Sequence, residues 1–213
     1  MLPQAIENLA EKLRFFPGVG NRSSLKLALD ILQLPEDKFL EFDQSLTEVR
    51  AQVCFCTNCG FFAQKSTQIP DETKIQCEIC NNSSRNTSQI CLVEKTTDVI
   101  TVERGNVYRG LYHVLTNLIS PLDNIFAEDT TINDLVERRL SGNKDKIELI
   151  LFFKAGFAAE ATTAYLKEFL KQKKLLEKVT ITRLAQGLPL YYNPETLDQA
   201  TMAKALEDRR EIS

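Results

Sequence analysis

The chain has 213 residues, 43% of them hydrophobic and 26% charged, which is typical of a globular protein with one large domain or two small ones. No apolar run approaches the ~20 residues that a membrane-spanning helix needs. The N-terminal segment lacks the basic start and cleavage site of a signal peptide, so we expect a cytoplasmic protein without a membrane partner. A net charge of -3 still allows nucleic-acid binding, because a local basic patch is sufficient.

The first part of the chain has a helical pattern. Apolar residues recur every three or four positions over residues 6–16 and predict an amphipathic helix. The segment P-G-V-G at residues 17–20 interrupts this pattern. We expect Asn21 to cap a second helix. A third helix should begin at Glu36, with an apolar face that continues to Val53.

The turn between the first two predicted helices is typical of a helix-hairpin-helix. Gly18 and Gly20 permit a tight backbone, and amides at such a turn form an anion site. Arg22 and Lys26 are four residues apart and therefore share one helix face beside those amides. These four residues predict contact with DNA phosphates regardless of base sequence. An ordinary helical corner with a solvated cationic face is the alternative.

Two C-x-x-C pairs predict a metal site. Cys56 and Cys59 form the first pair, Cys77 and Cys80 the second, and 17 residues separate the pairs. Each short turn aims two thiolates at one point, and two such turns complete the tetrahedral sulfur site that zinc favours. Because cysteine fills all four positions, we expect one structural zinc ion per chain. Gly60 suits the turn after the first pair.

The cysteine pattern also allows alternatives to zinc. Two unrelated pairs, or a redox C-x-x-C, are the alternatives to zinc, although a redox motif needs only one pair. Cys54 lies two residues before Cys56 and is a poorer ligand candidate. Cys91 lies in an apolar run and is predicted to be a buried small hydrophobe. Residues 61–73 between the pairs are polar, and we expect them to form an extended loop.

Strands and helices alternate after Ser88. This order predicts an α/β fold with a mainly parallel sheet and helices on both of its faces. Short apolar runs predict strands at residues 90–94, 111–115, 147–153 and 179–184. Helices are expected near residues 97–104, 131–140, 158–171 and 197–210.

The order of these motifs resembles the bacterial RecR family over nearly the whole chain. The matching segments, by their first residues, are L-R-F-F-P-G-V-G-N-R-S-S-L-K-L-A (Leu13), I-C-L-V-E (Ile90), Y-H-V-L (Tyr112), S-P-L-D (Ser120), E-A-T-T-A-Y (Glu160), Q-G-L-P (Gln186) and L-D-Q-A-T-M-A-K-A-L-E-D-R-R-E (Leu197), together with the two C-x-x-C pairs. The resemblance implies a helix-hairpin-helix at residues 1–53, a zinc finger at 54–87, a Toprim domain at 88–186 and a C-terminal tail at 187–213.

The resemblance also implies a function in recombinational DNA repair. Family members form a ring-like homo-oligomer, a dimer or a tetramer, that clamps DNA and loads recombinase together with RecO-type and RecF-type proteins. The two basic hairpin positions that touch DNA in the family correspond here to Arg22 and Lys26. The number of subunits and the preference for single or double strands are not implied.

The chain departs from the family pattern at several positions. Thr116 and Asn117 replace a pair of glycines, Ala158 replaces an acid, and Tyr191 and Tyr192 replace a second glycine pair. These departures mark a divergent member, and the role of residues 61–73 is not explained by the resemblance.

Toprim enzymes hold Mg²⁺ on a glutamate and a later D-x-D pair. Glu94 occupies the first position and Glu160 is retained, but Lys154 and the two residues after it offer no acid pair. We therefore expect a protein without catalysis. The alternatives are a Toprim-type nuclease or primase-like enzyme, and a zinc-stabilised interaction module that does not bind DNA. His113, the only histidine, is predicted to be structural.

Overall fold

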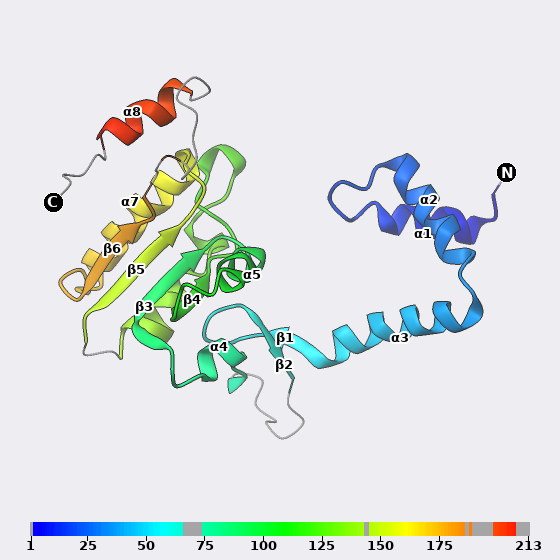
Figure 1. Cartoon of the computed structure of the whole chain (residues 1–213), viewed down its shortest axis with the longest axis horizontal. Helices are drawn as coiled ribbons and strands as arrows, with labels where there is room; N and C mark the ends of the chain where they lie inside the picture. Colours follow the sequence, from blue (N-terminus) through cyan, green and yellow to red (C-terminus); the bar gives the residue numbers. More distant parts are fainter. Residues whose placement is uncertain (1, 66–73, 143–144, 186–187, 189–197, 208–213) are drawn as a thin grey trace. The chain divides into compact units, whose positions relative to one another are not determined.

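The computed structural model describes residues 2–65, 74–142, 145–185, 188 and 198–207 (Figure 1). The backbone contacts divide the chain into two compact units, Met1–Cys54 and Phe55–Ser213. Among the described helices, none combines the length and the hydropathy needed to cross a membrane.

The first unit contains α1 (Gln4–Leu13), α2 (Asn21–Leu32) and α3 (Glu36–Gln52), three helices as predicted, although α1 ends at Leu13 and not at the predicted residue 16. α1 packs against α2, whose small residues Ser24 and Ala28 are buried. The expectation that Asn21 caps α2 is wrong. Gly20 is the N-cap, with φ −84° and ψ 178°, and Asn21 is the first helical residue.

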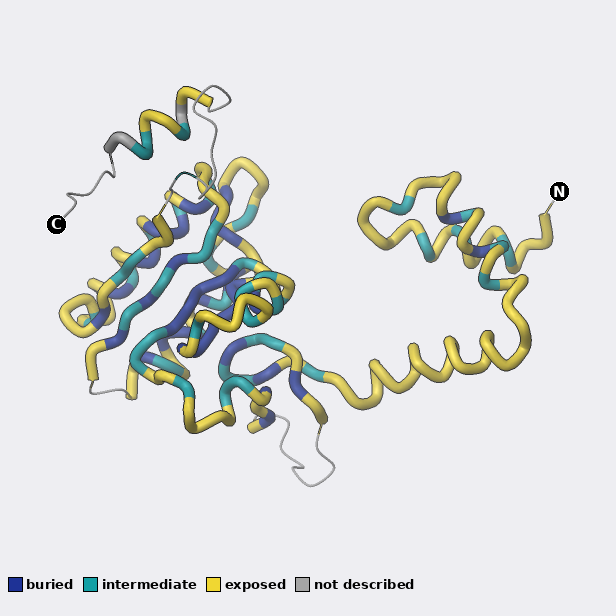
Figure 2. Tube along the Cα trace, viewed as in Figure 1, coloured by how far each residue is buried: buried dark blue, intermediate teal, exposed yellow. Residues whose placement is uncertain are grey.

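Helix α3 is exposed along its whole length (Figure 2). Its apolar side chains Phe42, Leu46 and Val49 are 43%, 55% and 60% exposed. The predicted continuation of this face to Val53 is wrong, because Val53 has left the helix with φ −108° and ψ 138°. It begins the strand β1 (Val53–Phe55) instead.

The cysteine-bearing module contains a two-stranded sheet and a short helix, and from Phe55 onward it belongs to the second compact unit. β1 pairs with β2 (Phe62–Gln64), and the short helix α4 (Glu78–Asn81) begins directly after Cys77 and contains Cys80. The expectation of an uninterrupted extended loop over 61–73 is therefore wrong for the residues of β2. Residues 66–73 lie outside the described residues.

The described residues of the second unit also form a four-stranded sheet in the order β4-β3-β5-β6. All three neighbouring pairs are parallel, as predicted. The strands are β3 (Asn86–Val93), β4 (Gly110–Val114), β5 (Ile147–Phe152) and β6 (Val179–Arg183), and the longer helices around them are α5 (Thr96–Arg104) and α7 (Phe157–Gln172). Because the strands run in the same direction, their carboxyl ends meet at one edge of the sheet.

Alternate residues of the central strand β3 face opposite sides of the sheet. Ile90 and Leu92 belong to the larger apolar core, which includes Leu166 of α7. Cys91 and Val93 belong to a smaller core with Val99 of α5. Each face of the sheet is thus covered by a helix (Figure 1), and the prediction that Cys91 is buried is confirmed, since it is 4% exposed.

The helix predicted at residues 131–140 is broken into two parts. α6 (Ile132–Leu135) is followed by a π-helical turn, η4 (Val136–Leu140), in which the Ser141 amide donates a hydrogen bond to the Val136 carbonyl over 2.9 Å. Short 3₁₀ turns, η2 (Pro121–Asp123) and η3 (Ala127–Asp129), precede it. The last predicted helix appears as α8 (Gln199–Glu207), which Asp198 precedes, while residues 197 and 208–210 of its predicted range lie outside the described residues.

Candidate metal centre and neighbouring sites

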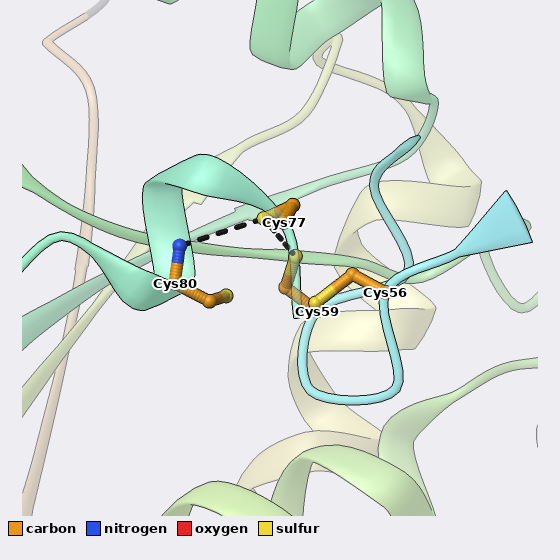
Figure 3. A group of neighbouring side chains, drawn as sticks. All are labelled: Cys56, Cys59, Cys77 and Cys80. Atoms are coloured by element: carbon orange, nitrogen blue, oxygen red, sulfur yellow. Dashed lines mark hydrogen bonds between the residues drawn. The ribbon is translucent and has the colours of Figure 1, made fainter. Parts of the chain in front are cut away.

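The structure brings Cys56, Cys59, Cys77 and Cys80 together (Figure 3). Their sulfur atoms all lie within 4.8 Å of one another, and the Cys59 and Cys77 sulfurs are 3.6 Å apart. A zinc ion with Zn–S bonds of ~2.3 Å requires tetrahedral S···S separations of about 3.8 Å. The four thiols therefore fit a zinc ion, and Cys54, which the sequence marks as the poorer candidate, is not part of the cluster.

The backbone of both C-x-x-C turns supports this arrangement. Gly60 N–H donates to the Cys56 carbonyl over 2.9 Å, and Asn81 N–H donates to the Cys77 carbonyl over 3.0 Å. Two further amides, those of Phe61 and Cys80, point at the sulfurs of Cys59 and Cys77 over 3.5 Å. Gly60 has φ +76°, a conformation that L side chains rarely adopt, so the turn needs glycine here.

Packing four thiols together perturbs their proton affinities. Hydrogen bonds from Cys59, Cys77 and Cys80 lower the pKa of the Cys56 thiol, because they stabilise its thiolate. The same contacts act in the opposite sense at Cys59, where hydrogen bonds with Cys56 and then the other two thiols raise the pKa. A divalent cation replaces these shared protons with direct bonds to sulfur, which is why metal binding to such clusters releases protons.

Two arginines that the sequence patterns did not single out contact the cysteine turns. The Arg139 guanidinium donates from Nη2 to the Cys80 sulfur over 2.7 Å and from Nε to the Asn58 carbonyl over 3.3 Å. Arg138 donates to the Thr57 carbonyl. Both arginines belong to η4, 81 residues along the chain from the carbonyls that they bind, so no local pattern could indicate the contact.

The hairpin between α1 and α2 carries the predicted DNA-contacting residues on its surface. Gly18, Gly20, Arg22 and Lys26 are all exposed. Gly18 has φ +83°, so the turn depends on glycine at this position. Gly20 offers no side-chain cap, which leaves the first amides of α2 without one. The Arg14 side chain also reaches this end of α2, where it donates to Asn21 Oδ1 over 3.0 Å.

The predicted Toprim acids lie at the carboxyl edge of the sheet. Glu94 and Glu160 both line a cavity of about 380 Å³ there, together with Lys154 and Arg183. Arg183 donates to both carboxylate oxygens of Glu160, over 2.7 and 3.2 Å. These hydrogen bonds lower the pKa of the Glu160 carboxyl. Glu94 lies 3.6 Å from the Lys95 ammonium.

This cavity does not assemble a group of metal-binding acids. Across the described ranges, the four cysteines are the one cluster of three or more ligand-type side chains close enough to share a metal ion. Mg²⁺ requires several hard oxygen ligands in a near-ideal geometry. The cavity instead combines acids with the cations of Lys154 and Arg183.

His113 is a buried part of the fold. It is 2% exposed, and its Nε2 lies 3.0 Å from the Thr131 carbonyl and 2.9 Å from the Thr131 hydroxyl. Burial lowers the pKa of His113 to about 4, which keeps the ring neutral near pH 7. Its burial agrees with the structural role predicted for it.

The residues that depart from the family pattern lie in different structural environments. Thr116 has φ +65°, a left-handed conformation, at a position where the family has glycine. The neighbouring Asn117 side chain donates to the Asp129 carbonyl over 3.0 Å. Ala158 is a half-buried residue in the first turn of α7. Tyr191 and Tyr192 lie outside the described residues.

Comparison with protein families gives two matches along the chain. Residues 6–50 match the model of the RecR helix-hairpin-helix. Residues 88–185 match the model of the Toprim domain. The cysteine-bearing module lies between the two matched ranges.

Proposed function

This chain belongs to the RecR family, as the order of its helix-hairpin-helix and Toprim domains shows, and we propose that it is a DNA-binding mediator of recombinational repair. In this proposal it clamps DNA without reading its sequence and has no catalytic activity of its own. It acts in the cytoplasm and helps to load recombinase together with RecO-type and RecF-type partners.

The observation that carries the proposal is the surface of the hairpin. Arg22 and Lys26 are exposed and lie one turn apart in the first half of α2, which begins directly after the turn that contains Gly18 and Gly20. The amides at the uncapped start of α2 attract an anion, and the two cations add charge beside them. Contacts of this kind reach phosphates and carry no base information.

The exposed face of α3 supports a homo-oligomer, a dimer or a tetramer. Phe39, Phe42, Leu46 and Val49 follow helical spacing and are each at least 43% exposed. Contiguous apolar surface of this kind marks an interaction site. We propose that a second copy of the chain covers it, because closed symmetric pairs bury the same face of both partners. Several hairpins on one DNA molecule would then compensate for the few cations of each chain.

The remaining sites fit a protein without chemistry of its own. Cys56, Cys59, Cys77 and Cys80 would hold one zinc ion, which leaves no open position for a substrate. At the Toprim edge, the pairing of Glu160 with Arg183 and of Glu94 with Lys95 favours ion pairs over a Mg²⁺ site. We also propose the division into residues 1–53, 54–87, 88–186 and 187–213.

Titration of labelled DNA at several salt concentrations tests the proposal. Each duplex phosphate contact contributes about 0.9 to the slope of log affinity against log salt. Arg22→Ala and Lys26→Ala should each reduce the slope, and the double variant should reduce it further. Lys38→Ala is the matched control, because Lys38 is an exposed lysine of the same unit that pairs with Glu41 on α3. It should leave the slope unchanged.

The interaction-module alternative gives a different result in the same titration. An interaction module that does not bind DNA predicts no binding by the wild-type protein. A folded double variant that keeps the wild-type affinity and slope would remove the hairpin from the DNA contact. Two DNA duplexes of unrelated sequence should bind equally, since the proposed contacts are made to the backbone.

A further inference from the structure

We propose that Arg139 is a positioning residue of the zinc site, which holds the two C-x-x-C turns in register and ties them to the Toprim domain. This inference rests on the zinc assignment and goes beyond the proposed DNA function. In this proposal the zinc site contains, besides the four cysteines, a cationic side chain from a distant part of the sequence.

The Arg139 guanidinium spans both halves of the site. Its Nε donates to the carbonyl of Asn58, which lies inside the first cysteine pair, over 3.3 Å. Its Nη2 donates to the sulfur of Cys80, in the second pair, over 2.7 Å. A single planar group therefore fixes the position of one turn relative to the other, which a single ammonium group would do less well.

The charge of Arg139 suits the occupied site. Four thiolates around Zn²⁺ leave two net negative charges. Cys80 is half-buried, whereas Cys56, Cys59 and Cys77 are buried. Its thiolate is therefore the one most open to water. A charge-assisted hydrogen bond from a guanidinium stabilises that thiolate and fixes its direction.

The turn that carries Arg139 is packed into the apolar core. This turn is η4, whose residues Val136 and Leu140 are each 2% exposed and belong to the main core of the Toprim domain. The neighbouring Arg138 binds the Thr57 carbonyl from the same turn and pairs with Asp134 over 3.3 Å. The two consecutive arginines thus bind two consecutive carbonyls of the first cysteine turn. Arg139 differs from Arg138 because it also contacts the Cys80 sulfur.

Arg138 provides a matched control for the test. Arg138→Gln removes an arginine that contacts a carbonyl of the cysteine turn, whereas Arg139→Gln also removes the bond to sulfur. Zinc affinity of the full chain is measured by competition with a chromophoric chelator. Co²⁺ loading gives a second reading, because its thiolate charge-transfer and d–d bands report the number and geometry of the sulfur ligands.

We expect Arg139→Gln to weaken zinc binding ~10–100-fold, as is typical when an outer partner of a metal ligand is removed. Its Co²⁺ d–d bands should broaden or shift. Arg138→Gln should weaken zinc binding less than about threefold and leave the Co²⁺ spectrum unchanged, because the sulfur contact remains. The zinc affinity of Arg139→Lys should lie between that of the wild type and that of Arg139→Gln.

Three results would overturn the proposal. One is a folded Arg139→Gln variant with wild-type zinc affinity and Co²⁺ spectrum. Another is an equal loss in Arg138→Gln, which would assign the effect to docking of the module and not to the sulfur contact. If Arg139→Gln does not fold, Arg139→Lys decides, and wild-type affinity in that variant contradicts the proposal. Loss of metal in Cys80→Ser checks the zinc assignment separately.

Discussion

The guanidinium of Arg183 binds both carboxylate oxygens of Glu160, over 2.7 and 3.2 Å, in the lining of the cavity that Glu94 and Lys154 also line. Arg183 is the last residue of β6, and Glu160 lies in the first turn of α7. The acid that the family pattern retains is therefore already paired with a cation, which competes with any bound Mg²⁺ for the same oxygens.

We expect no strand cleavage when the protein is incubated with Mg²⁺ or Mn²⁺ and supercoiled, linear or single-stranded DNA. Arg183→Gln should not create activity, since releasing Glu160 still leaves no acid pair after β5. Gel analysis of the DNA over a time course provides the measurement. Cleavage that is lost in Glu94→Ala would instead support the Toprim nuclease alternative.

The metal content of the purified chain should be one zinc ion per chain. Serine at Cys56, Cys59, Cys77 or Cys80 should reduce it and destabilise the protein, because structural zinc contributes an apparent ~10–16 kcal/mol of binding free energy. Cys54→Ser is the control, since Cys54 lies outside the cluster. Elemental analysis and thermal unfolding measure both effects. Metal lost from Cys54→Ser but kept in Cys56→Ser would show that the ligand set is wrong.

The parallel sheet could be predicted from the sequence, whereas the contacts that complete the metal centre could not. Apart from Glu148, the residues of β5 are apolar on both faces of the strand, which is typical of a central parallel strand. The four cysteines carry a short-range spacing that constrains their geometry directly. The apolar run and the cysteine spacing are both local patterns, so both can be recognised without knowledge of the tertiary structure.

The contacts of Arg139 and Arg183 depend on tertiary structure. Arg139 and Cys80 are 59 residues apart, and Arg183 and Glu160 are 23 apart. In sequence, Arg138 and Arg139 look like the solvated face of an amphipathic helix. The π-helical turn that carries them has an i→i+5 hydrogen bond, from the Ser141 amide to the Val136 carbonyl, where an α-helix has i→i+4 bonds, and no residue pattern marks it.

Charge on the apolar face of α3 should disrupt the proposed homo-oligomer. Leu46 is 55% exposed, and burying a leucine fully stabilises an interface by about 1.5–3 kcal/mol. Leu46→Glu should therefore lower the mass measured by light scattering at micromolar concentration. Gln44→Glu on the opposite side of the helix is the control and should keep the wild-type mass. A wild-type protein that is monomeric with and without DNA would contradict the clamp.

Thr116→Gly should stabilise the protein by about 1 kcal/mol. Thr116 is β-branched and has φ +65°, a conformation that disfavours a branched side chain and suits glycine. The hydrogen bond from its hydroxyl to the Leu115 carbonyl offsets part of this gain. Asn117→Gly is the control, because Asn117 does not have a positive φ and its side chain donates to the Asp129 carbonyl. Urea unfolding should show that this second change destabilises the protein.

The buried ring of His113 should make stability depend on pH in a defined window. Burial lowers its pKa in the folded protein to about 4, below the ordinary value of 6.5, and the positive charge of Arg139 acts in the same direction. The unfolded chain therefore binds a proton more readily than the folded one between these two values. The contribution of the neutral ring is fully present above pH 6.5 and is lost progressively as the pH falls toward 4.

The size of this effect follows from the shift. One pKa unit corresponds to about 1.4 kcal/mol, so the loss from His113 should approach about 3 kcal/mol at the acid end of the window. The free energy of unfolding of wild type and His113→Gln, measured in urea from pH 7 to pH 4, isolates it. Glutamine does not titrate, and acid dissociation of zinc affects both proteins. The difference between the two curves therefore reports the contribution of His113 protonation to the free energy of unfolding. Parallel curves would show that the ring is not held neutral by burial.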